Sequence, residues 1–158
     1  MAGVRTLLGP DELRALTGQE LGTSAWHDVT QQRIQAFADA TEDWERIHVD
    51  PERVAETPFG VPIAHGLYTL SLGPKFLYEI FRMTGHSLGL NYGFDKVRFL
   101  APVRVDSRVR MRASLVGSEP IEGGTKFRIR QVFEIEGEER PACVAESIIA
   151  YFDPQETS

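Results

Sequence analysis

Residues 63–81, IAHGLYTLSLGPKFLYEIF, have apolar side chains that point in nearly every direction when the segment is written as a helix. These side chains are Leu67, Leu70, Leu72, Phe76, Leu77, Ile80 and Phe81. A helix of this kind is buried on most of its sides. Gly73-Pro74 stands inside the run and predicts a kink or an interruption there. The sequence therefore predicts a buried helix that the rest of the chain covers.

Strand patterns dominate the chain after this helix. Apolar and polar residues alternate in DSRVRMRASLVG (residues 106–117) and TKFRIRQVFEIEG (125–137), and PACVAESIIAYFD (141–153) closes the chain. A shorter alternation, KVRFL, lies within residues 89–105, and turn clusters separate the later stretches. Such alternation is typical of half-buried antiparallel strands. We expect one sheet that covers one face of the helix, which makes a two-layer α+β domain.

The chain before the helix predicts shorter elements. LGTSAWHDVT, residues 21–30, is expected to form a strand. Thr30 is placed to cap a helix over QQRIQAFADAT, residues 31–41. Asp50 is expected to cap a further short helix with Pro51 at its first position. The length of 158 residues predicts a single domain over residues 1–158.

Composition and charge exclude several classes of protein. The formal net charge of −6 makes nucleic acid an unexpected partner. No apolar run is long enough to cross a bilayer, so we expect no membrane association. The single cysteine, Cys143, cannot form an intramolecular disulfide and is expected to be a small buried hydrophobic residue. We therefore expect a cytoplasmic protein.

The polar segment TEDWERIHVDPERVAETPFGVPIAHG, residues 41–66, holds Asp43, His48, His65 and Gly66. In the order Asp, four residues, His, Asp-Pro, Phe-Gly and Ala-His-Gly, it resembles the hydratase motif of MaoC-like dehydratases and (R)-specific enoyl-CoA hydratases. The later stretch NYGFDKVRFLAPVRVDSRV is similar to the nodulation protein N-like subgroup. The resemblance covers about residues 20–152. It implies a hot-dog fold, in which a sheet wraps a long helix, a homodimer, and an acyl thioester of coenzyme A as the ligand.

The resemblance also implies roles for single residues. Asp43 and His48 match the catalytic pair, and Gly66 matches the glycine of the oxyanion hole. Asp43 and His48 are five positions apart, so they fit a loop that leaves the helix at Thr41 rather than one helix face. A carboxylate and an imidazole that touch one water can supply the base and the acid that hydration needs. A glycine amide at a helix start is free to bind the thioester oxygen.

Further positions carry weaker assignments. We assign substrate binding to His65, Asn91 and Tyr92, with His65 expected to orient the loop rather than to react. Three basic side chains could contact the phosphates of coenzyme A: Lys96, Arg98 and Arg104. The alternative is that they are exposed to solvent and bind no ligand. His27 and His86 are expected to be surface or structural residues. A zinc site from Asp43, His48 and His65 is disfavoured, because their spacing matches no common zinc pattern.

Two positions depart from the family pattern. Glu45-Arg46 stands where many (R)-hydratases carry Asn-Pro, and Glu42 stands where a glycine is common. The first departure leaves acyl-chain preference open, and the second predicts an altered turn.

The predicted function is (R)-specific hydration of trans-2-enoyl-CoA to 3-hydroxyacyl-CoA, or the reverse dehydration, with no metal or redox cofactor. Two alternatives stay open: a hot-dog thioesterase, and a non-catalytic module that binds acyl-CoA. The Asp43–His48 pair favours the first function, since a binding module needs no groups for proton transfer. The sequence leaves open the acyl-chain length, the choice between coenzyme A and acyl carrier protein, and the physiological direction.

Overall fold

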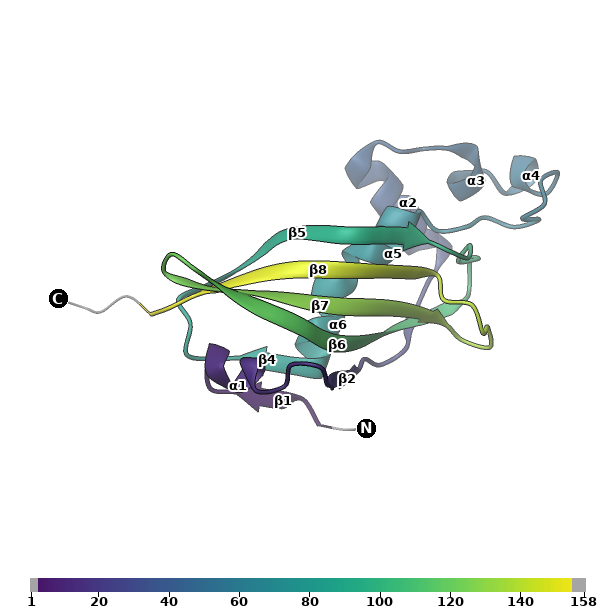
Figure 1. The fold of residues 1–158 in the computed structure, drawn as a ribbon. Coiled ribbons are helices and arrows are strands. Elements are labelled where there is room, and N and C mark those ends of the chain that lie inside the picture. The colour runs from purple at the N-terminus through teal and green to yellow at the C-terminus, as the bar shows by residue number, and fades with distance from the viewer. Residues whose placement is uncertain (1–2, 155–158) are drawn as a thin grey trace.

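The computed structural model describes residues 3–154 as a sheet with helices on one face and a helical lobe at one end (Figure 1). Its main sheet has six strands, with the order β2-β6-β7-β8-β5 and with β3 also paired to β6. The long strands are β5 (Leu88–Phe99), β6 (Arg108–Ile121), β7 (Gly124–Ile135) and β8 (Cys143–Phe152). All of their pairings are antiparallel, which confirms the predicted two-layer α+β architecture.

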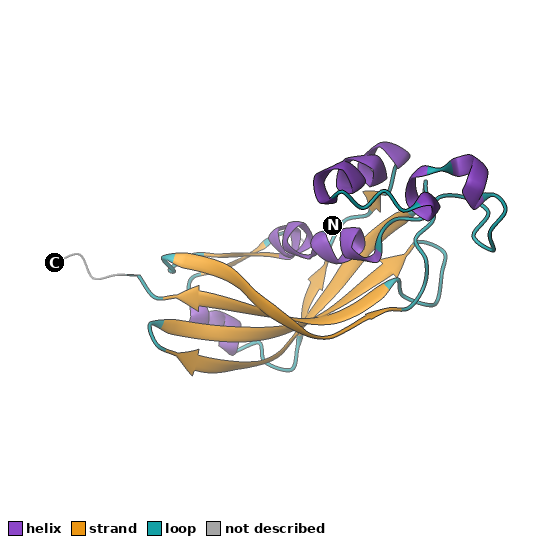
Figure 2. Cartoon of the chain, turned by 90° about the horizontal axis from the view of Figure 1, so that it is seen from above, coloured by secondary structure: helices purple, strands orange, loops and turns teal. Residues whose placement is uncertain are grey.

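The central helix lies against one face of this sheet and is interrupted where the sequence predicts (Figure 2). It consists of α5 (Gly66–Ser71) and α6 (Gly73–Ile80), with Leu72 between them and Pro74 in the first turn of α6. A Cβ atom on Gly73 would lie 3.0 Å from Oε1 of Gln131 on β7. The helix therefore breaks at the point where its backbone comes close to the sheet.

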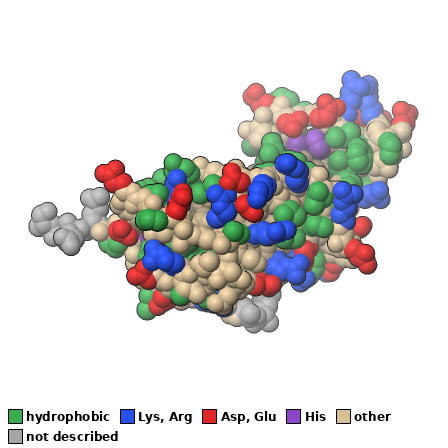
Figure 3. All heavy atoms as spheres, in the orientation of Figure 1, with side chains coloured by type: hydrophobic (Ala, Val, Ile, Leu, Met, Phe, Trp, Pro, Cys, Tyr) green, Lys and Arg blue, Asp and Glu red, His purple; other side chains and the backbone are tan. Residues whose placement is uncertain are grey.

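The alternation of β6 and β7 places one set of side chains in the core and the other on the opposite face. Val109, Met111, Phe127 and Phe133 are buried. Their neighbours on the outer face pair across strands, as in the ion pair of 2.8 Å between Arg110 Nε and Glu134 Oε2. Figure 3 shows basic and acidic side chains mixed over this outer face. One face of the sheet is thus buried and the other is exposed to solvent, as the alternating pattern predicted.

β5 differs from the prediction of a half-buried strand. Nearly all of its residues are exposed, and within the described chain it pairs with β8 on one side only. Several large apolar side chains are exposed along it: Leu88, Leu90, Tyr92, Phe94 and Phe99. The physical reason is its place at the edge of the sheet, where one flank and part of the inner face have no covering element.

The expected strand over residues 21–30 is also corrected, because it is divided into β2 (Glu20–Thr23) and β3 (His27–Asp28). Between them, the backbone N–H of Met111 donates to Oγ of Ser24 rather than to a backbone carbonyl. This side chain takes the place of a backbone acceptor and ends the regular pairing.

Three helices form the lobe at one end of the sheet: α2 (Gln31–Thr41), α3 (Arg46–Val49) and α4 (Pro51–Val54). Thr30 and Asp50 cap α2 and α4 with their side chains, as predicted. α3 was not predicted, and it places His48 on a short helix rather than in a loop. The remaining elements are β1 (Arg5–Leu7), α1 (Pro10–Arg14) and β4 (Phe81–Met83), with β1 parallel to β4. No helix of the described residues is long and apolar enough to cross a bilayer.

Candidate active site

The loop after α2 turns sharply enough to bring Asp43 back over the start of α5. Its first residue, Glu42, is the C-cap of α2 and has a left-handed backbone with φ of 60°. Glycine is the residue best suited to this conformation. Glu42 therefore adopts it at a steric cost that glycine would not carry.

His48 is buried, with 8% of its surface exposed, and its ring is held by the main chain. Nδ1 lies 2.7 Å from the carbonyl oxygen of Ile63. A carbonyl only accepts hydrogen bonds, so Nδ1 carries the proton and Nε2 of the neutral ring has a free lone pair. Burial lowers the pKa of His48, and the nearby His65 lowers it further. The imidazole is therefore neutral at pH 7, with Nε2 available as a base.

His65 lies between Phe37 and His48. Its ring centroid is 3.7 Å from that of His48, with the rings stacked, and 4.9 Å from that of Phe37. Nε2 of His65 lies 2.9 Å from the carbonyl oxygen of Asp43, to which it donates. His65 thus holds the Asp43 loop and supports the His48 ring, in agreement with the orienting part expected of it.

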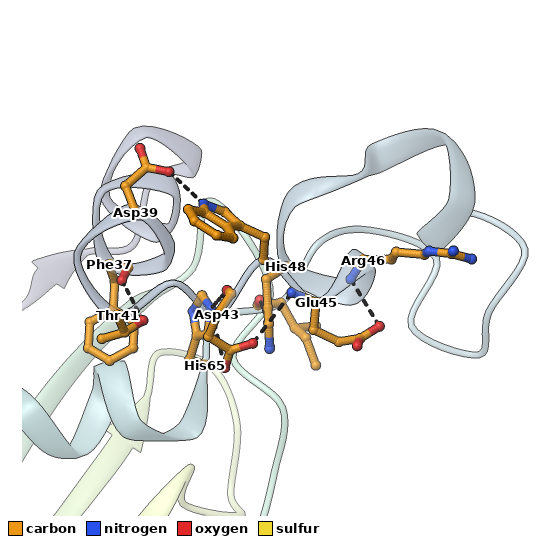
Figure 4. Close-up of polar contacts among 10 residues, drawn as sticks. Phe37, Asp39, Thr41, Asp43, Glu45, Arg46, His48 and His65 are labelled. Atoms are coloured by element: carbon orange, nitrogen blue, oxygen red, sulfur yellow. Dashed lines mark hydrogen bonds and ion pairs between the residues drawn. The ribbon is translucent and has the colours of Figure 1, made fainter.

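Asp43 is half exposed, with 52% of its side chain open to solvent. Its Oδ1 accepts a hydrogen bond of 3.4 Å from the backbone N–H of Glu45, and its Oδ2 lies 3.9 Å from Nε2 of His65. Figure 4 shows Asp43, His48 and His65 gathered between α2 and α3. The sequence-predicted pair is therefore brought together, with one ligand atom of Asp43 and one of His48 within 4.8 Å of each other.

Gly66 is the first residue of α5, and no side chain caps this helix. A Cβ atom at this position would lie 2.7 Å from the ring of Phe99 on β5. The helix comes so close to the sheet here that packing alone is a sufficient reason for a glycine at this position. The same residue also lines the next feature of the site, a cavity.

A cavity of about 430 Å³ joins these residues. Asp43, His48, His65 and Gly66 line it together with Thr69. The rest of its wall is apolar: Ile47, Phe59, Ile63, Ala64, Leu67, Phe99, Leu100, Ala101, Pro102, Val103 and Ala142. A mostly apolar cavity with a few convergent polar groups is the usual form of a site for a small organic ligand.

The same residues are the best candidates for a metal among the described residues. The ligand atoms of Asp43, His48 and His65 lie within 4.8 Å of one another. One nitrogen of each imidazole is already used by a backbone carbonyl, which leaves Nε2 of His48 and Nδ1 of His65. Nδ1 of His65 is buried and has no partner in the described chain. Stacked rings direct their lone pairs along their own planes, which is a poor arrangement for a shared ion.

Asn91 and Tyr92 are not brought to this cavity within one chain. Both lie in the first half of β5, and Asn91 lines a second cavity of about 500 Å³ beside α6. The Tyr92 ring is exposed and lies 4.0 Å below the ammonium of Lys126. Their part in substrate binding stays a prediction.

The basic side chains assigned to coenzyme A have mixed positions. Lys96 lies 3.8 Å from Glu146, and Arg98 donates to the carbonyl of its neighbour Val97. Arg104 pairs with Ile63 in an isolated bridge, beside the cavity wall.

Three residues assigned as structural have structural surroundings. His27 is buried and its Nε2 lies 2.7 Å from the hydroxyl of Tyr68. His86 packs edge-on against Tyr151. Burial raises the pKa of Cys143 to about 11, so its thiol stays protonated and unreactive.

Sequence reasoning missed Phe37 and Phe99. Phe37 was interpreted only as part of the buried face of its helix, yet its ring supports His65. Phe99 forms the contact that excludes a side chain at Gly66. Neither has a sequence signal of its own, because both contacts join segments that are far apart in the chain.

Comparison with known proteins agrees with this architecture. Residues 12–136 match the family model described as MaoC like domain. The chain is 48% identical over 149 residues to 3-hydroxyacyl-thioester dehydratase Z of Mycobacterium tuberculosis, covering 94% of this chain and 99% of the relative. It is 44% identical over 156 residues to nodulation protein N of Rhizobium meliloti, with 92% of each chain covered.

A solved structure shows the same fold. The (R)-hydratase from A. caviae, described as involved in PHA biosynthesis, superposes with a TM-score of 0.67 at 23% sequence identity. The match covers 84% of this chain and 94% of the hydratase. This likeness confirms the hot-dog fold. The family match spans most of the sequence and the relatives are matched over nearly their whole length, so the chain belongs to the MaoC-like dehydratase family.

Proposed function

We propose that this protein is a hydro-lyase that hydrates trans-2-enoyl-CoA to (R)-3-hydroxyacyl-CoA and catalyses the reverse dehydration. One observation carries the proposal: the Asp43 carboxylate, the unprotonated Nε2 of His48 and the backbone of Gly66 line one largely apolar cavity. The relatives named as a 3-hydroxyacyl-thioester dehydratase and an (R)-hydratase support the reaction class and its stereochemistry.

Each step uses a group of this chain. Asp43 and Nε2 of His48 hold one water, and His48 takes a proton from it as the oxygen bonds to C3 of the enoyl group. The double-bond electrons move towards the thioester and place negative charge on its oxygen. The amide of Gly66 donates to that oxygen, a contact typically worth about 3–4 kcal/mol of barrier. The enolate then takes the proton from His48 at C2.

The sum of these steps adds one hydrogen and one hydroxyl group, so electrons balance without an oxidant or a reductant. The reaction therefore needs no redox cofactor. We propose that the enzyme also works without a metal, and that the coenzyme A thioester is its substrate. Dialysis against a chelator is expected to leave the hydration rate unchanged. A loss of rate that added Zn²⁺ restores would instead assign a metal to Asp43, His48 and His65.

The decisive experiment is turnover of (R)- and (S)-3-hydroxyacyl-CoA across several chain lengths. We expect dehydration of the (R) series only. Release of free coenzyme A without change in the enoyl absorbance would favour a thioesterase. Tight binding with no turnover would favour the binding module, and either result would contradict the proposal.

We also propose a homodimer formed by β5. A long, exposed and apolar edge strand in a soluble protein is a template for pairing with another strand. A second copy related by a twofold axis presents the same strand in the antiparallel direction. The side chains of Phe94 and Phe99 lie on the helix side of the sheet, since they are opposite the buried residues Ser147 and Cys143 of β8. Pairing of two β5 strands would cover both rings.

We propose a register that keeps inward-facing residues of the two strands opposite one another. Gly89 also lies on the helix side, opposite Tyr151. If Phe94 lies on the twofold axis, Phe99 is opposite the partner's Gly89, and inward residues meet inward residues. Directly opposite residues lie about 5 Å apart at Cβ. The partner's Asn91 would then lie beside the wall of the Asp43–His48 cavity, which restores the substrate-binding part predicted for that residue.

A disulfide tests this register. Phe94→Cys is expected to give a cross-linked dimer under mild oxidation, because opposite Cβ atoms of such a pair are within disulfide reach. The native thiol does not compete, since Cys143 is buried and stays protonated. Val116→Cys, on β6 and exposed, is the control and should not cross-link in the same way. A monomer by sedimentation would overturn the dimer.

A further inference from the structure

The second cavity lies on the helix side of the sheet, between α6 and the first half of β5. It has a volume of about 500 Å³, comparable to that of the cavity beside His48. Part of its lining is apolar: Pro74, Leu77, Phe81, Met83, Leu90 and Ile149. Polar side chains also line it: Tyr78, Arg82, Thr84, His86, Asn91 and Tyr151. The steps proposed above leave this cavity without a use.

Polar groups stand among these apolar walls. Tyr151, at the end of β8, packs edge-on against His86 and Phe127, with centroid distances of 5.0 and 5.9 Å. Burial raises the pKa of Tyr151 to about 12, so its phenol keeps its proton and can donate. No hydrogen bond to its hydroxyl occurs among the described residues. Asn91 lines the same cavity from the inner face of β5, opposite Ile149.

The proposed dimer places this cavity next to the catalytic one of the other subunit. Phe99 forms part of the wall beside Gly66 and would be opposite the partner's Gly89. Gly89 is itself paired with Tyr151 on the next strand. Neighbouring strands lie about 4.8 Å apart, so the partner's Tyr151 backbone is about 10 Å from that of Phe99. An acyl chain that starts at Gly66 can cover this distance.

We propose that the cavity between α6 and β5 receives the distal end of the acyl group bound to the opposite subunit, and that Tyr151 and Asn91 select a chain carrying a hydroxyl or keto oxygen there. The inference rests on the proposed hydratase function and on the β5 dimer. It goes beyond both, because it assigns a substrate class to residues that the reaction itself does not use.

The preference for an oxygenated acyl chain follows from the free-energy cost of leaving hydrogen-bond donors without an acceptor. A plain alkyl end would displace water from the Tyr151 hydroxyl and the Asn91 amide and return no hydrogen bond. An oxygen at the same position accepts from them. Sites built to bond a substrate oxygen discriminate strongly against the analogue that lacks it. This cavity is partly open, so we expect a preference of about tenfold rather than the larger factors of closed sites.

Direct binding tests the proposal without requiring turnover. Calorimetry compares a saturated acyl-CoA with its ω-hydroxy derivative of equal chain length, over a series of lengths, on the dimeric wild type. We expect the hydroxylated ligand to bind about tenfold more tightly at the length that reaches the cavity, and Tyr151→Phe to abolish the difference. This variant removes one oxygen and keeps the ring, and its melting temperature reports whether it is folded.

The outcomes separate this inference from the function on which it rests. Equal binding of both ligands at every length, or a preference that survives both Tyr151→Phe and Asn91→Leu, would overturn the selection, as would a monomeric protein. Turnover of the matching enoyl-CoA pair is measured in parallel. Tight and selective binding without any hydration would reject the proposed enzyme and keep the cavity assignment.

Discussion

The His65 ring stacks on that of His48, with 3.7 Å between the two centroids. Through its opposite edge His65 also donates to the carbonyl of Asp43. One buried side chain therefore links the His48 ring, the proposed base, to the loop that carries Asp43.

The first prediction concerns the proposed pair. Asp43→Asn and His48→Ala are each expected to lower hydration of crotonyl-CoA by at least about 100-fold, the low end for loss of general acid–base catalysis. Asp106→Asn removes a carboxylate from an exposed turn and is the matched control, with an unchanged rate expected. Wild-type rates in both site variants would show that the pair is not catalytic.

His65→Gln is expected to lower kcat more than it raises KM, because the glutamine cannot stack on His48. It should also move the acidic limb of the pH–rate profile to higher pH. His65 contributes to lowering the pKa of His48, so its removal raises that pKa and the base is protonated at a higher pH. A fall in rate with an unmoved limb would indicate a purely structural part for His65.

Gly66→Ala separates packing from catalysis. The added methyl group meets the ring of Phe99 at 2.7 Å, and overpacking of this kind typically costs about 1–3 kcal/mol of unfolding free energy. Phe99→Ala in the same chain should recover stability, measured by urea unfolding. If the thioester must approach the Gly66 backbone, the stabilised double variant stays slow relative to Phe99→Ala alone. A rate equal to that of Phe99→Ala would assign Gly66 to packing only.

The pH dependence of stability has a defined sign. Burial lowers the pKa of both His27 and His48 below the ordinary value of 6.5, so the unfolded chain binds more protons just below that pH. The unfolding free energy is therefore highest above pH 6.5 and is lost as the pH falls through the folded-state pKa values. His27→Gln should flatten this slope, as measured by chemical denaturation at several pH values. An unchanged slope would show that His27 does not contribute to the pH dependence of the unfolding free energy.

Glu42→Gly tests the left-handed turn after α2. Glycine adopts this conformation without the steric cost that a side chain carries, which is of order 1 kcal/mol. We expect a rise in melting temperature of about 2–4 °C for a chain of this size. Thr41→Gly, one residue earlier and helical, should lower it instead.

Local sequence patterns correctly predicted the elements that are determined by residues close together in the chain. The caps at Thr30 and Asp50, the break at Gly73-Pro74 and the alternation of β6 and β7 each depend on residues within a few positions of one another. The pair Asp43–His48 was found through a motif, and its meeting point in space was not readable from spacing alone.

The wrong predictions concern elements whose structure depends on contacts with segments far away in the chain. Exposure of β5 depends on which strand lies at the edge of the sheet, and KVRFL has the same alternation whether or not a neighbour covers it. α3 is a helix of four residues that depends on a cap from the Glu45 side chain and on the hydrogen bond from the Gln31 side chain to the His48 carbonyl. The split at Ser24 depends on Met111, which is far along the chain.

The hydrogen bond between Nδ1 of His48 and the carbonyl of Ile63 has a consequence for how such a protein can diverge. The tautomer of the proposed base is set by the main chain, which every amino acid at position 63 provides equally. Substitutions in the cavity wall can therefore reshape the space for the acyl group while the reactive nitrogen keeps its lone pair. A lineage that carries this arrangement is free to explore new substrates one wall residue at a time.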